Sequence, residues 1–204
     1  MAEHAVSGAI KLAEKWELPL SKESAICLAL YLSKLVEWNR HVNLTGARDL
    51  HEILDAHLPD SFALAKLCPE RANVVDIGSG GGLPALPFAI LRPDCHVTLV
   101  EPRAKRVAFL NMAVRACDCR LARVVRGREE DIPAASFSVA SSKATFRPEH
   151  WLQIAPRLLI EGGMAVVFAT SPVAADSAAA DLRCFVDYRT GSGSPRWAGC
   201  FCFT

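Results

Sequence analysis

Closely spaced glycines between two apolar stretches are the residues of this chain whose types and spacing point most directly to chemistry. The segment from Val74 to Pro93 reads VVDIGSGGGLPALPFAILRP, and its first half has the form D-x-G-x-G-x-G from Asp76 to Gly82. Glycines allow a tight turn and let a ligand approach the main chain, because no Cβ stands in the way. We therefore predict a strand, a ligand-binding glycine turn, and a helix that begins near Leu83.

The spacing of these glycines argues against a dinucleotide ligand. A G-x-G-x-x-G fingerprint that starts at Gly78 needs its last glycine at the position of Leu83. A second apolar stretch, Cys95 to Val100, ends in Glu101, where the second strand of a βαβ unit places an acid over the first turn. A carboxylate accepts hydrogen bonds from both hydroxyls of a ribose. The pattern predicts a site for S-adenosylmethionine (AdoMet), a nucleoside joined to methionine without phosphates.

A glycine-rich first turn alone is weak evidence, because α/β proteins of many functions carry one. Alternating glycines between two acids at the right offset make cofactor binding the better interpretation. The residues expected to form the cofactor site are Asp76, Gly78, Gly80, Gly82, Leu83 and Glu101.

The first 70 residues show helical patterns without a strand pattern. Three helical regions are expected there: Val6 to about Leu18, Ser21 to about Arg40, and Asp49 to Leu67. Ser21 is the expected N-cap of the second, and Pro59 is expected to break or kink the third. The loop NRHVNLTGARD, Asn39 to Asp49, fits either a plain connection or the lining of a cleft.

The rest of the chain alternates strand and helix patterns. Further strands are expected at Arg120 to Val125, Phe137 to Ala140 and Gly162 to Ala169, and further helices at Arg103 to Cys117, Pro148 to Leu159 and Val173 to Arg183. Two antiparallel strands, Cys184 to Tyr188 and Trp197 to Phe203, should close the sheet. We predict an α/β fold with a mostly parallel seven-stranded sheet, in which residues 1–70 form a helical extension and residues 71–204 the cofactor-binding domain.

Two polar residues after the third expected strand also deserve a functional interpretation. Ligands of such sheets lie at the carboxyl ends of the strands, so Arg128 and Glu129 are candidates for flanking an adenine. An acid at this point is equally well explained by a helix start, where the helix dipole favours negative charge.

Composition indicates a soluble intracellular protein. The chain has 204 residues, 51% of them apolar, and a formal net charge of +1. Its eight cysteines form no C-x-x-C pair and lack histidines at ligand spacing, so we expect reduced thiols and no metal site. No apolar signal or membrane-length run is present. One segment is rich in basic side chains. For any single one of them an ordinary solvated helix face is the better interpretation, whereas as a group they could form a basic rim for an anionic partner such as RNA: Arg103, Lys105, Arg106, Arg115, Arg120, Arg123, Arg126 and Arg128.

Several separated motifs in order make the chain resemble the small-subunit ribosomal RNA guanine-N7 methyltransferases, the RsmG or GidB family. The resemblance covers roughly Tyr31 to Thr170, and its motifs are NRHVNLTGARD, HLPDS from His57, VDIGSGGGLPALP with ILRP, KRVAFL from Lys105, and REE from Arg128. It implies a class I (Rossmann-like) AdoMet-dependent methyltransferase, a cytoplasmic monomer that acts on 16S ribosomal RNA or the small ribosomal subunit.

The resemblance also implies roles for individual residues. The glycine turn and Glu101 would hold the methionine and ribose parts of AdoMet, with Arg128 and Glu129 near the adenine. Asn39, Asn43, Thr45 and His57 would lie near the methyl-transfer cleft, and the implied catalytic residues are Asn39, His57 and Lys143.

Three positions depart from the family pattern. Ser138 stands where relatives tend to have Asp, Lys143 where they have Arg, and Thr170 where a Lys usually follows the fifth strand. A lysine keeps the charge of an arginine and loses its fork of donors. The departures bear on the acceptor and the activity more than on the cofactor.

The chemistry implied is simple, because guanine N7 has a lone pair at neutral pH. Methyl transfer then needs orientation and no base. The chain has no [DNS]-P-P-[FYW] after the fourth strand and no Pro-Cys nucleophile, which argues against transfer to an exocyclic amine or a cytosine carbon. Candidates for holding the RNA backbone are Arg40, Arg48, Arg126, Lys143 and Arg147.

Two alternatives remain beside this hypothesis. One is a methyltransferase of the same fold that acts on another RNA or a small molecule. The other is a catalytically silent RNA- or cofactor-binding paralogue, which the three departures motivate. A nicotinamide-dependent oxidoreductase fits poorly, because Leu83 interrupts its fingerprint and no Tyr-x-x-x-Lys set is present.

Overall fold

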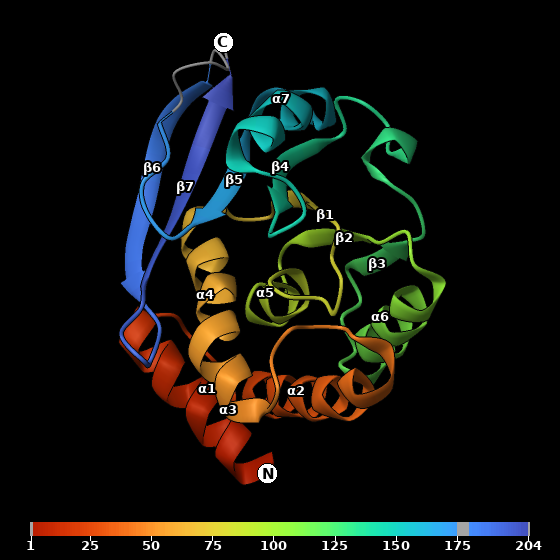
Figure 1. Cartoon of the computed structure of the whole chain (residues 1–204), viewed down its shortest axis with the longest axis vertical. Coiled ribbons are helices and arrows are strands. Elements are labelled where there is room, and N and C mark those ends of the chain that lie inside the picture. Colours follow the sequence, from red (N-terminus) through yellow and green to blue (C-terminus); the bar gives the residue numbers. More distant parts are fainter. Residues whose placement is uncertain (1, 175–179, 204) are drawn as a thin grey trace.

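The computed structural model describes residues 2–174 and 180–203, which form one seven-stranded sheet with helices on both faces (Figure 1). The strand order is β3-β2-β1-β4-β5-β7-β6. The strands are β1 Asn73–Ile77, β2 His96–Val100, β3 Ala122–Val125, β4 Phe137–Ser142, β5 Leu159–Ala169, β6 Ala180–Arg189 and β7 Pro195–Phe203. Strands β1 to β5 are parallel, and β7 runs antiparallel to both β5 and β6, so the predicted mostly parallel sheet is confirmed.

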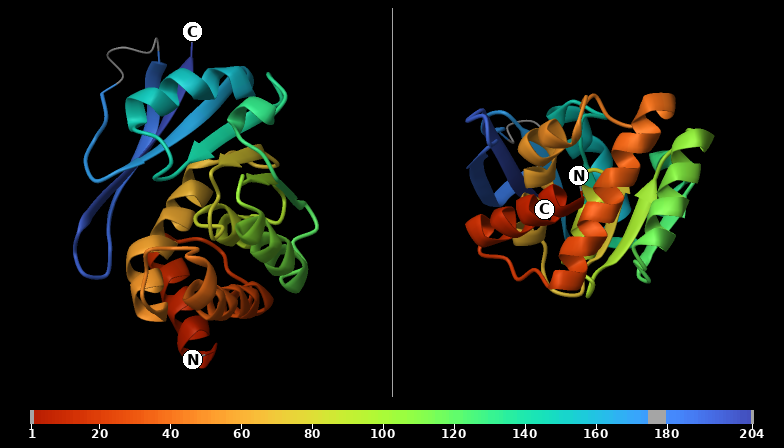
Figure 2. Two further views of the ribbon diagram at one scale, coloured as in Figure 1. Left: turned by 45° about the vertical axis from the view of Figure 1, so that its right-hand side comes forward. Right: turned by 90° about the horizontal axis from the view of Figure 1, so that it is seen from below.

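The helices lie in layers on the two faces of the sheet (Figures 1 and 2). Their bounds are α1 Ala2–Trp16, α2 Lys22–Val42, α3 Leu50–Glu52, α4 Leu58–Leu67, α5 Ala85–Leu91, α6 Ala104–Ala116 and α7 Pro148–Leu158, with a π-helical turn η1 at Ile53–His57 and a 3₁₀ turn η2 at Glu129–Asp131. Helix α7 packs on β4 and β5, while α4, α5 and α6 cover the opposite face and α1 and α2 pack beneath them. None of the helices in the described residues is long and apolar enough to cross a membrane.

Alternating residues of each strand enter two separate cores. In β1, Val74 belongs to the core shared with α2, α4, α5 and α6, while Val75 belongs to the core under α7. Val75 lies opposite Thr98 of β2 and Ala140 of β4. Because these strands are parallel and in register, their carboxyl ends meet at one edge of the sheet, and the residues that follow them lie close together.

The long N-terminal helix α2 forms where its apolar stripe predicts. Ser21 is its N-cap, accepting a hydrogen bond from Ser24 N at 3.0 Å, and the helix ends at Asn43 in the left-handed conformation. The predicted stripe of Leu28, Tyr31, Leu32 and Leu35 is fully buried, and Trp38 packs against Phe109 of α6. Helix α2 therefore covers α5 and α6, the helices that flank the glycine turn.

The buried phenol of Tyr31 joins this helix directly to the glycine turn. Its hydroxyl donates a hydrogen bond of 2.7 Å to the main-chain oxygen of Gly81, and burial raises the pKa of Tyr31 well above its usual value. We expect Tyr31→Phe to lower the free energy of unfolding by about 1–2 kcal/mol, because the Gly81 carbonyl loses its buried donor. Urea denaturation would measure this change, and an unchanged midpoint would contradict it.

The region from Asp49 to Leu67 is helical on both sides of Pro59, so of the two expected outcomes, a break or a kink, the structure excludes the break. Helix α3 widens into the π turn η1, and Pro59 is the second residue of α4. The first turn of a helix has main-chain N–H groups without an intrahelical partner, so a proline costs little there. His57 is the last residue of η1, so this irregular turn sets its position.

The helix predicted for Val173 to Arg183 is wrong where the structure describes this stretch. Residues 173–174 are not helical, residues 175–179 lie outside the described part, and Ala180 begins β6. Along β6, Asp181 pairs with Cys202 and Leu182 with Phe201 of β7. Pairing at the sheet edge outweighs the helix preference of an alanine-rich sequence, because propensity is a weak local effect.

Candidate functional site

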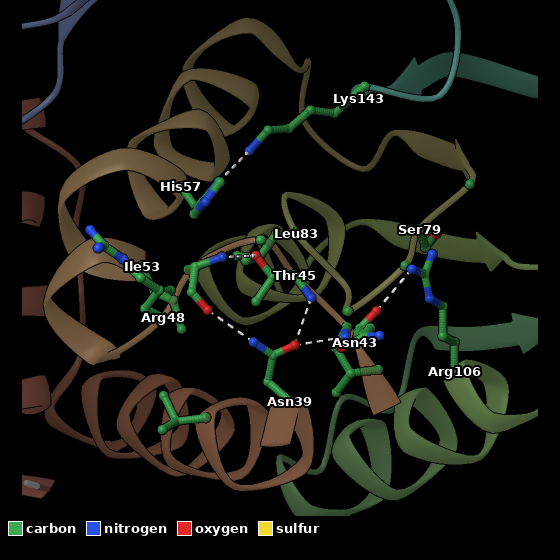
Figure 3. A pocket seen from close by; sticks show the side chains of 18 of the residues that line it. Asn39, Asn43, Thr45, Arg48, Ile53, His57, Ser79, Leu83, Arg106 and Lys143 are labelled. Carbon is green, nitrogen blue, oxygen red and sulfur yellow. Dashed lines mark hydrogen bonds between the residues drawn. The ribbon is translucent and has the colours of Figure 1, made fainter. Parts of the chain in front are cut away.

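A cleft of about 780 Å³ opens at the carboxyl edge of the sheet, beside the glycine turn (Figure 3). Its walls come from segments far apart in the chain: the end of α2, the loop that follows it, η1, the turn after β1, helix α6 and the loop after β4. Among its lining residues are Asn39, Thr45, His57, Gly80, Leu83 and Lys143. The cleft thus brings the expected cofactor turn and the three implied catalytic residues to one place.

The glycine turn needs its glycines for two reasons. Gly78 and Gly80 have φ angles of +75° and +57°, which side-chain-bearing residues rarely adopt. A Cβ on Gly78 would also collide with Thr145, and one on Gly81 would lie 2.9 Å from Leu35 Cδ1. Gly81 was not among the expected site residues, although it lines the cleft. The turn leaves main chain exposed to the cleft, which suits a ligand that binds close to the backbone.

Glu101 holds the turn from the end of β2. Its Oε2 accepts a hydrogen bond from Gly80 N at 3.0 Å and its Oε1 one from Arg103 N at 2.9 Å, while the side chain is 3% exposed. A carboxylate has about four acceptor positions, so two remain after these bonds. Glu101 is not among the residues that line the cleft, so a ribose reaches its two remaining acceptor positions only beside Gly80, whose main-chain N–H the carboxylate holds.

Arg106 connects this acid to the loop after α2, a link that sequence reasoning did not identify. Its Nη1 lies 3.7 Å from Glu101 Oε2, and its Nη2 donates to the main-chain oxygen of Asn43 at 2.9 Å. The bond to Asn43 is drawn in Figure 3. The sequence had drawn attention to Arg106 through the KRVAFL motif and the basic segment, and neither predicted its contacts with Glu101 and Asn43.

Asp76 lies under the turn and does not line the cleft. It is 1% exposed, and Ser141 Oγ of β4 donates to its Oδ1 at 2.7 Å. Burial raises the pKa of Asp76 to about 6, although the hydrogen bonds from Ser141 and Ser79 oppose this shift. Ionised Asp76 would be stabilised by a positive charge placed in the adjacent cleft.

Arg128 and Glu129 lie at the carboxyl end of β3 and are not among the residues that line the cleft. Arg128 is exposed and precedes η2, where its main-chain N–H donates to Asp131 Oδ2 at 2.8 Å. The main-chain oxygen of Glu129 accepts from the guanidinium of Arg157. The η2 turn is therefore held by its own hydrogen bonds to Asp131 and Arg157, outside the residues that line the cleft.

Asn39 lines the cleft, and its amide supports the loop that follows α2. Its Oδ1 accepts from Leu44 N at 2.7 Å and Thr45 N at 2.9 Å, and its Nδ2 donates to the main-chain oxygen of Ala47 at 2.9 Å (Figure 3). Thr45 Oγ1 in turn accepts from Ala47 N. These contacts make Asn39 a residue that positions the cleft wall, with one N–H still available.

Four polar side chains from four segments form a cluster at the opposite wall, and two of them, His57 and Lys143, line the cleft. Lys143, which follows β4, forms an ion pair with Asp60 of α4 and lies 3.4 Å from His57 Nδ1. Tyr188 of β6 donates to Asp60 Oδ1 at 2.7 Å. Sequence reasoning named Lys143 and His57 and missed Asp60 and Tyr188; the fourth residue of HLPDS was the only signal for Asp60.

Only one of the three departures from the family pattern lies in the cleft. Lys143 lines it. Ser138 sits at the amino end of β4, where its Oγ bonds both main-chain groups of Asn73, so it is remote from the carboxyl edge. Thr170 is exposed after β5 and is not among the lining residues. Ser138 and Thr170 therefore do not line the cleft, so the expectation that all three departures bear on the acceptor is wrong for these two residues.

The basic residues proposed to hold RNA are spread around this edge. Arg40 and Arg48 line the cleft, and Arg126 and Arg147 are exposed. In the described residues, no group of three or more His, Cys, Asp or Glu side chains could hold a metal ion. All eight cysteines are free thiols.

The sheet order, the reversed β7 and the glycine turn facing an acid after β2 define a class I AdoMet-dependent methyltransferase fold. A solved AdoMet-dependent methyltransferase from Aquifex aeolicus has this fold with a TM-score of 0.59 at 14% identity, over 85% of this chain and 98% of that one. TYW2 from Pyrococcus horikoshii, solved with MeSAdo, gives 0.58 at 15% identity, over 72% and 62%.

Sequence comparison identifies the family within this fold. The model of the GidB family, described as rRNA small subunit methyltransferase G, matches residues 25–193. Ribosomal RNA small subunit methyltransferase G of Anaeromyxobacter sp. is 38% identical over 153 residues, 72% of this chain and 69% of that protein. The protein of that name from Neisseria meningitidis is 34% identical over 72% and 70%. The chain belongs to the GidB family.

Proposed function

We propose that the chain transfers the methyl group of AdoMet to N7 of a guanine in 16S ribosomal RNA. Membership of the GidB family supports an AdoMet-dependent rRNA methyltransferase. The observation that carries the proposal is the shared cleft: the glycine turn braced by Glu101 forms one wall, and the His57 and Lys143 side chains lie on the other. A single space of about 780 Å³ is thereby available to the methyl donor and to one base.

We propose that residues on the glycine-turn side of the cleft bind the cofactor and that residues on the opposite side face the acceptor. Residues 71–204 would form the AdoMet-binding domain and residues 1–70 a helical extension that supports the acceptor side, in a cytoplasmic monomer. Arg128 and Glu129 are proposed to approach the adenine from beyond the cleft edge. The residues proposed to hold the rest of the cofactor are Asp76, Gly78, Gly80, Gly82, Leu83 and Glu101.

In the mechanism we propose, this chain orients the acceptor and removes no proton. AdoMet, when bound, supplies an electrophilic methyl group on a cationic sulfur. Guanine N7 already has a lone pair, so holding it in line with the methyl group supplies most of the rate. Burial, followed by the charge of Lys143, lowers the pKa of His57, so its ring is neutral at pH 7. Methylation places positive charge on the base, and the carboxylate of Asp60 offsets the charge of Lys143 nearby.

The pKa of Asp76 predicts how cofactor affinity depends on pH. AdoMet carries positive charge, so it should bind better to the enzyme with ionised Asp76. Above pH 6 the carboxyl group is mostly ionised, and affinity should be constant; below about pH 6, affinity should fall by up to about tenfold per pH unit. Calorimetric titrations from pH 5 to 8 would measure this, and Asp76→Asn should remove the dependence.

The stability of the cofactor-free protein provides a control, because Asp76 should make stability change with pH in the direction opposite to AdoMet affinity. The pKa of folded Asp76 lies above that of an unfolded Asp, so this group's stabilising contribution is complete below the unfolded pKa of about 3.8 and is lost as pH rises through about 6. Wild-type stability relative to Asp76→Asn should therefore decrease with pH while AdoMet affinity increases. If stability and AdoMet affinity changed in the same direction with pH, the two effects could not both be assigned to Asp76.

The decisive experiment for the function is methyl transfer from labelled AdoMet. Purified small subunits and protein-free 16S rRNA, both from cells that lack this modification, would be compared as acceptors and the modified base mapped. Label on guanine N7 in either substrate supports the proposal. AdoMet binding without label on rRNA would instead favour a silent binding paralogue, and label on another RNA or a small molecule would favour the same-fold alternative.

A further inference from the structure

The contact between Lys143 and His57 determines which ring nitrogen of His57 carries the hydrogen. Lys143 Nζ lies 3.4 Å from His57 Nδ1. An ammonium group only donates, so Nδ1 must accept, and a neutral ring then carries its hydrogen on Nε2. Because His57 lines the cleft and its Nδ1 is directed to Lys143, the ring offers a neutral N–H donor to a ligand bound in the cleft (Figure 3).

Lys143 is itself fixed by groups behind it. Asp60 is 2% exposed and forms the ion pair with Lys143. Tyr188 completes the carboxylate's coordination, and burial together with Asp60 raises the pKa of the Tyr188 phenol, so this group remains a donor at all working pH values. A buried, paired carboxylate holds the ammonium in one direction and leaves its charge nearly balanced.

The turn that carries His57 is also held from outside the cleft. Asp55, within η1, accepts a hydrogen bond of 2.7 Å from Ser192 N in the connection between β6 and β7. Together with the bond from Tyr188 to Asp60, this contact joins the β6–β7 pair to η1 and α4. These contacts hold the turn that carries His57, and Lys143 holds the ring itself, as a residue that reads a ligand requires.

We propose that His57 Nε2–H donates a hydrogen bond to the O6 carbonyl of the target guanine and thereby selects guanine over adenine. This inference rests on the proposed function and assigns a recognition role within it. The major-groove edge of guanine presents acceptors at both N7 and O6, whereas adenine presents a donor, its N6 amino group, beside N7. A fixed N–H donor next to the methyl group thus favours guanine and opposes adenine, whose amino group it would face.

A neutral donor is also the better choice for this reaction. The base becomes cationic when N7 is methylated, so a cation directed at O6 would oppose the transition state. The new bond uses the N7 lone pair, the electrons of the broken carbon–sulfur bond remain on sulfur, and His57 keeps its proton throughout. The network supplies direction and selectivity without any proton transfer.

The test compares two variants of His57. In His57→Gln, the side-chain oxygen can accept from Lys143 and the amide N–H₂ can donate to O6; in His57→Ala, both contacts are lost. With small subunits lacking the modification as acceptor, we expect His57→Ala to lose about 10- to 100-fold in kcat/KM and His57→Gln to lose no more than about fivefold. Affinity for AdoMet, measured by calorimetry, should stay within about twofold in both, which also reports that they are folded.

A pH profile separates recognition from a merely structural role. At saturating AdoMet, wild-type kcat/KM for the subunit should fall at pH values below the usual pKa of histidine, because a proton on Nδ1 would face Lys143. The charged groups around the ring are Lys143, Asp60, Glu52 and Arg196, and all remain in both variants. The low-pH loss should therefore be absent from His57→Gln.

The control is His51→Gln, an exposed histidine of α3 that does not line the cleft, and its kinetics should match wild type. The inference is overturned if His57→Ala keeps wild-type kcat/KM, if His57→Gln is no better than His57→Ala, or if His57→Gln retains the low-pH loss. A wild-type protein that methylates no guanine in rRNA would instead overturn the proposed function, which separates the two failures.

Discussion

Replacing Glu101 with alanine should abolish measurable AdoMet binding and, with it, all methyl transfer. The carboxylate is the proposed partner of the ribose hydroxyls, and it also accepts from Gly80 N and Arg103 N. Its loss removes the ligand contact and leaves both N–H groups of the turn without their acceptor. Losing a buried, charged hydrogen-bond acceptor typically costs about 2 to 5 kcal/mol, so we expect affinity to fall at least about 30-fold in calorimetry.

Two further variants show whether this loss is specific. Glu130→Ala removes an exposed acid that does not line the cleft, and its AdoMet affinity should equal that of wild type. Gly80→Asp places a side chain where φ is +57° and a second carboxylate close to Glu101, and it should bind as poorly as Glu101→Ala. Wild-type affinity in either Glu101→Ala or Gly80→Asp would show that the cofactor lies elsewhere.

The parts of the fold that could be predicted are those whose signals are local. The glycine turn, the acid after β2 and the α2 stripe each lie within one or two neighbouring elements, and all three were found from residue type and spacing. The β6 strand was missed at its start, because its stability comes from pairing with β7 and its local sequence favours a helix.

The contacts of the cleft wall could not be predicted from local patterns either, because they too join residues that are far apart in the sequence. Tyr188 and Asp60 are 128 residues apart, and Arg106 and Asn43 are 63 apart. Nothing in residue type alone pairs a tyrosine near the end of the chain with an acid in the third helical region. Resemblance to the family drew attention to His57 and Lys143, whereas only the three-dimensional arrangement identifies the groups that orient them.

These contacts also explain how the helical extension takes part in the site. Tyr31 binds the glycine turn, and Asn39 holds the loop above it. His57 lines the opposite wall, where Asp60 pairs with the lining residue Lys143. The segment before β1 thus contributes to both walls of the cleft. A cut between residues 70 and 71 would expose the buried face of α4 and dismantle the cleft, so we regard the extension as part of the catalytic unit.

The pair formed by Asp60 and Lys143 should show strong energetic coupling in a double-mutant cycle. Asp60→Asn leaves a partly buried ammonium without its counter-ion, and Lys143→Gln leaves a buried carboxylate with only the Tyr188 hydroxyl. Each single variant should lower the free energy of unfolding by about 3 kcal/mol, whereas the double variant, which is neutral and retains hydrogen-bonding groups, should lose less than either. Urea denaturation of the four proteins gives a coupling energy, which we expect to exceed about 3 kcal/mol.

In this double-mutant cycle, methylation activity should not recover together with stability. This difference would show that Lys143 positions His57 and does more than stabilise the fold. The double variant recovers stability and still lacks the ammonium that fixes the His57 tautomer, so its methylation of small subunits should remain at least about tenfold below wild type. Glu37→Gln, which breaks an exposed ion pair with Lys34, should change neither quantity. Additive losses in the cycle would show that Asp60 and Lys143 act independently, and restored activity in the double variant would show that Lys143 does not direct His57.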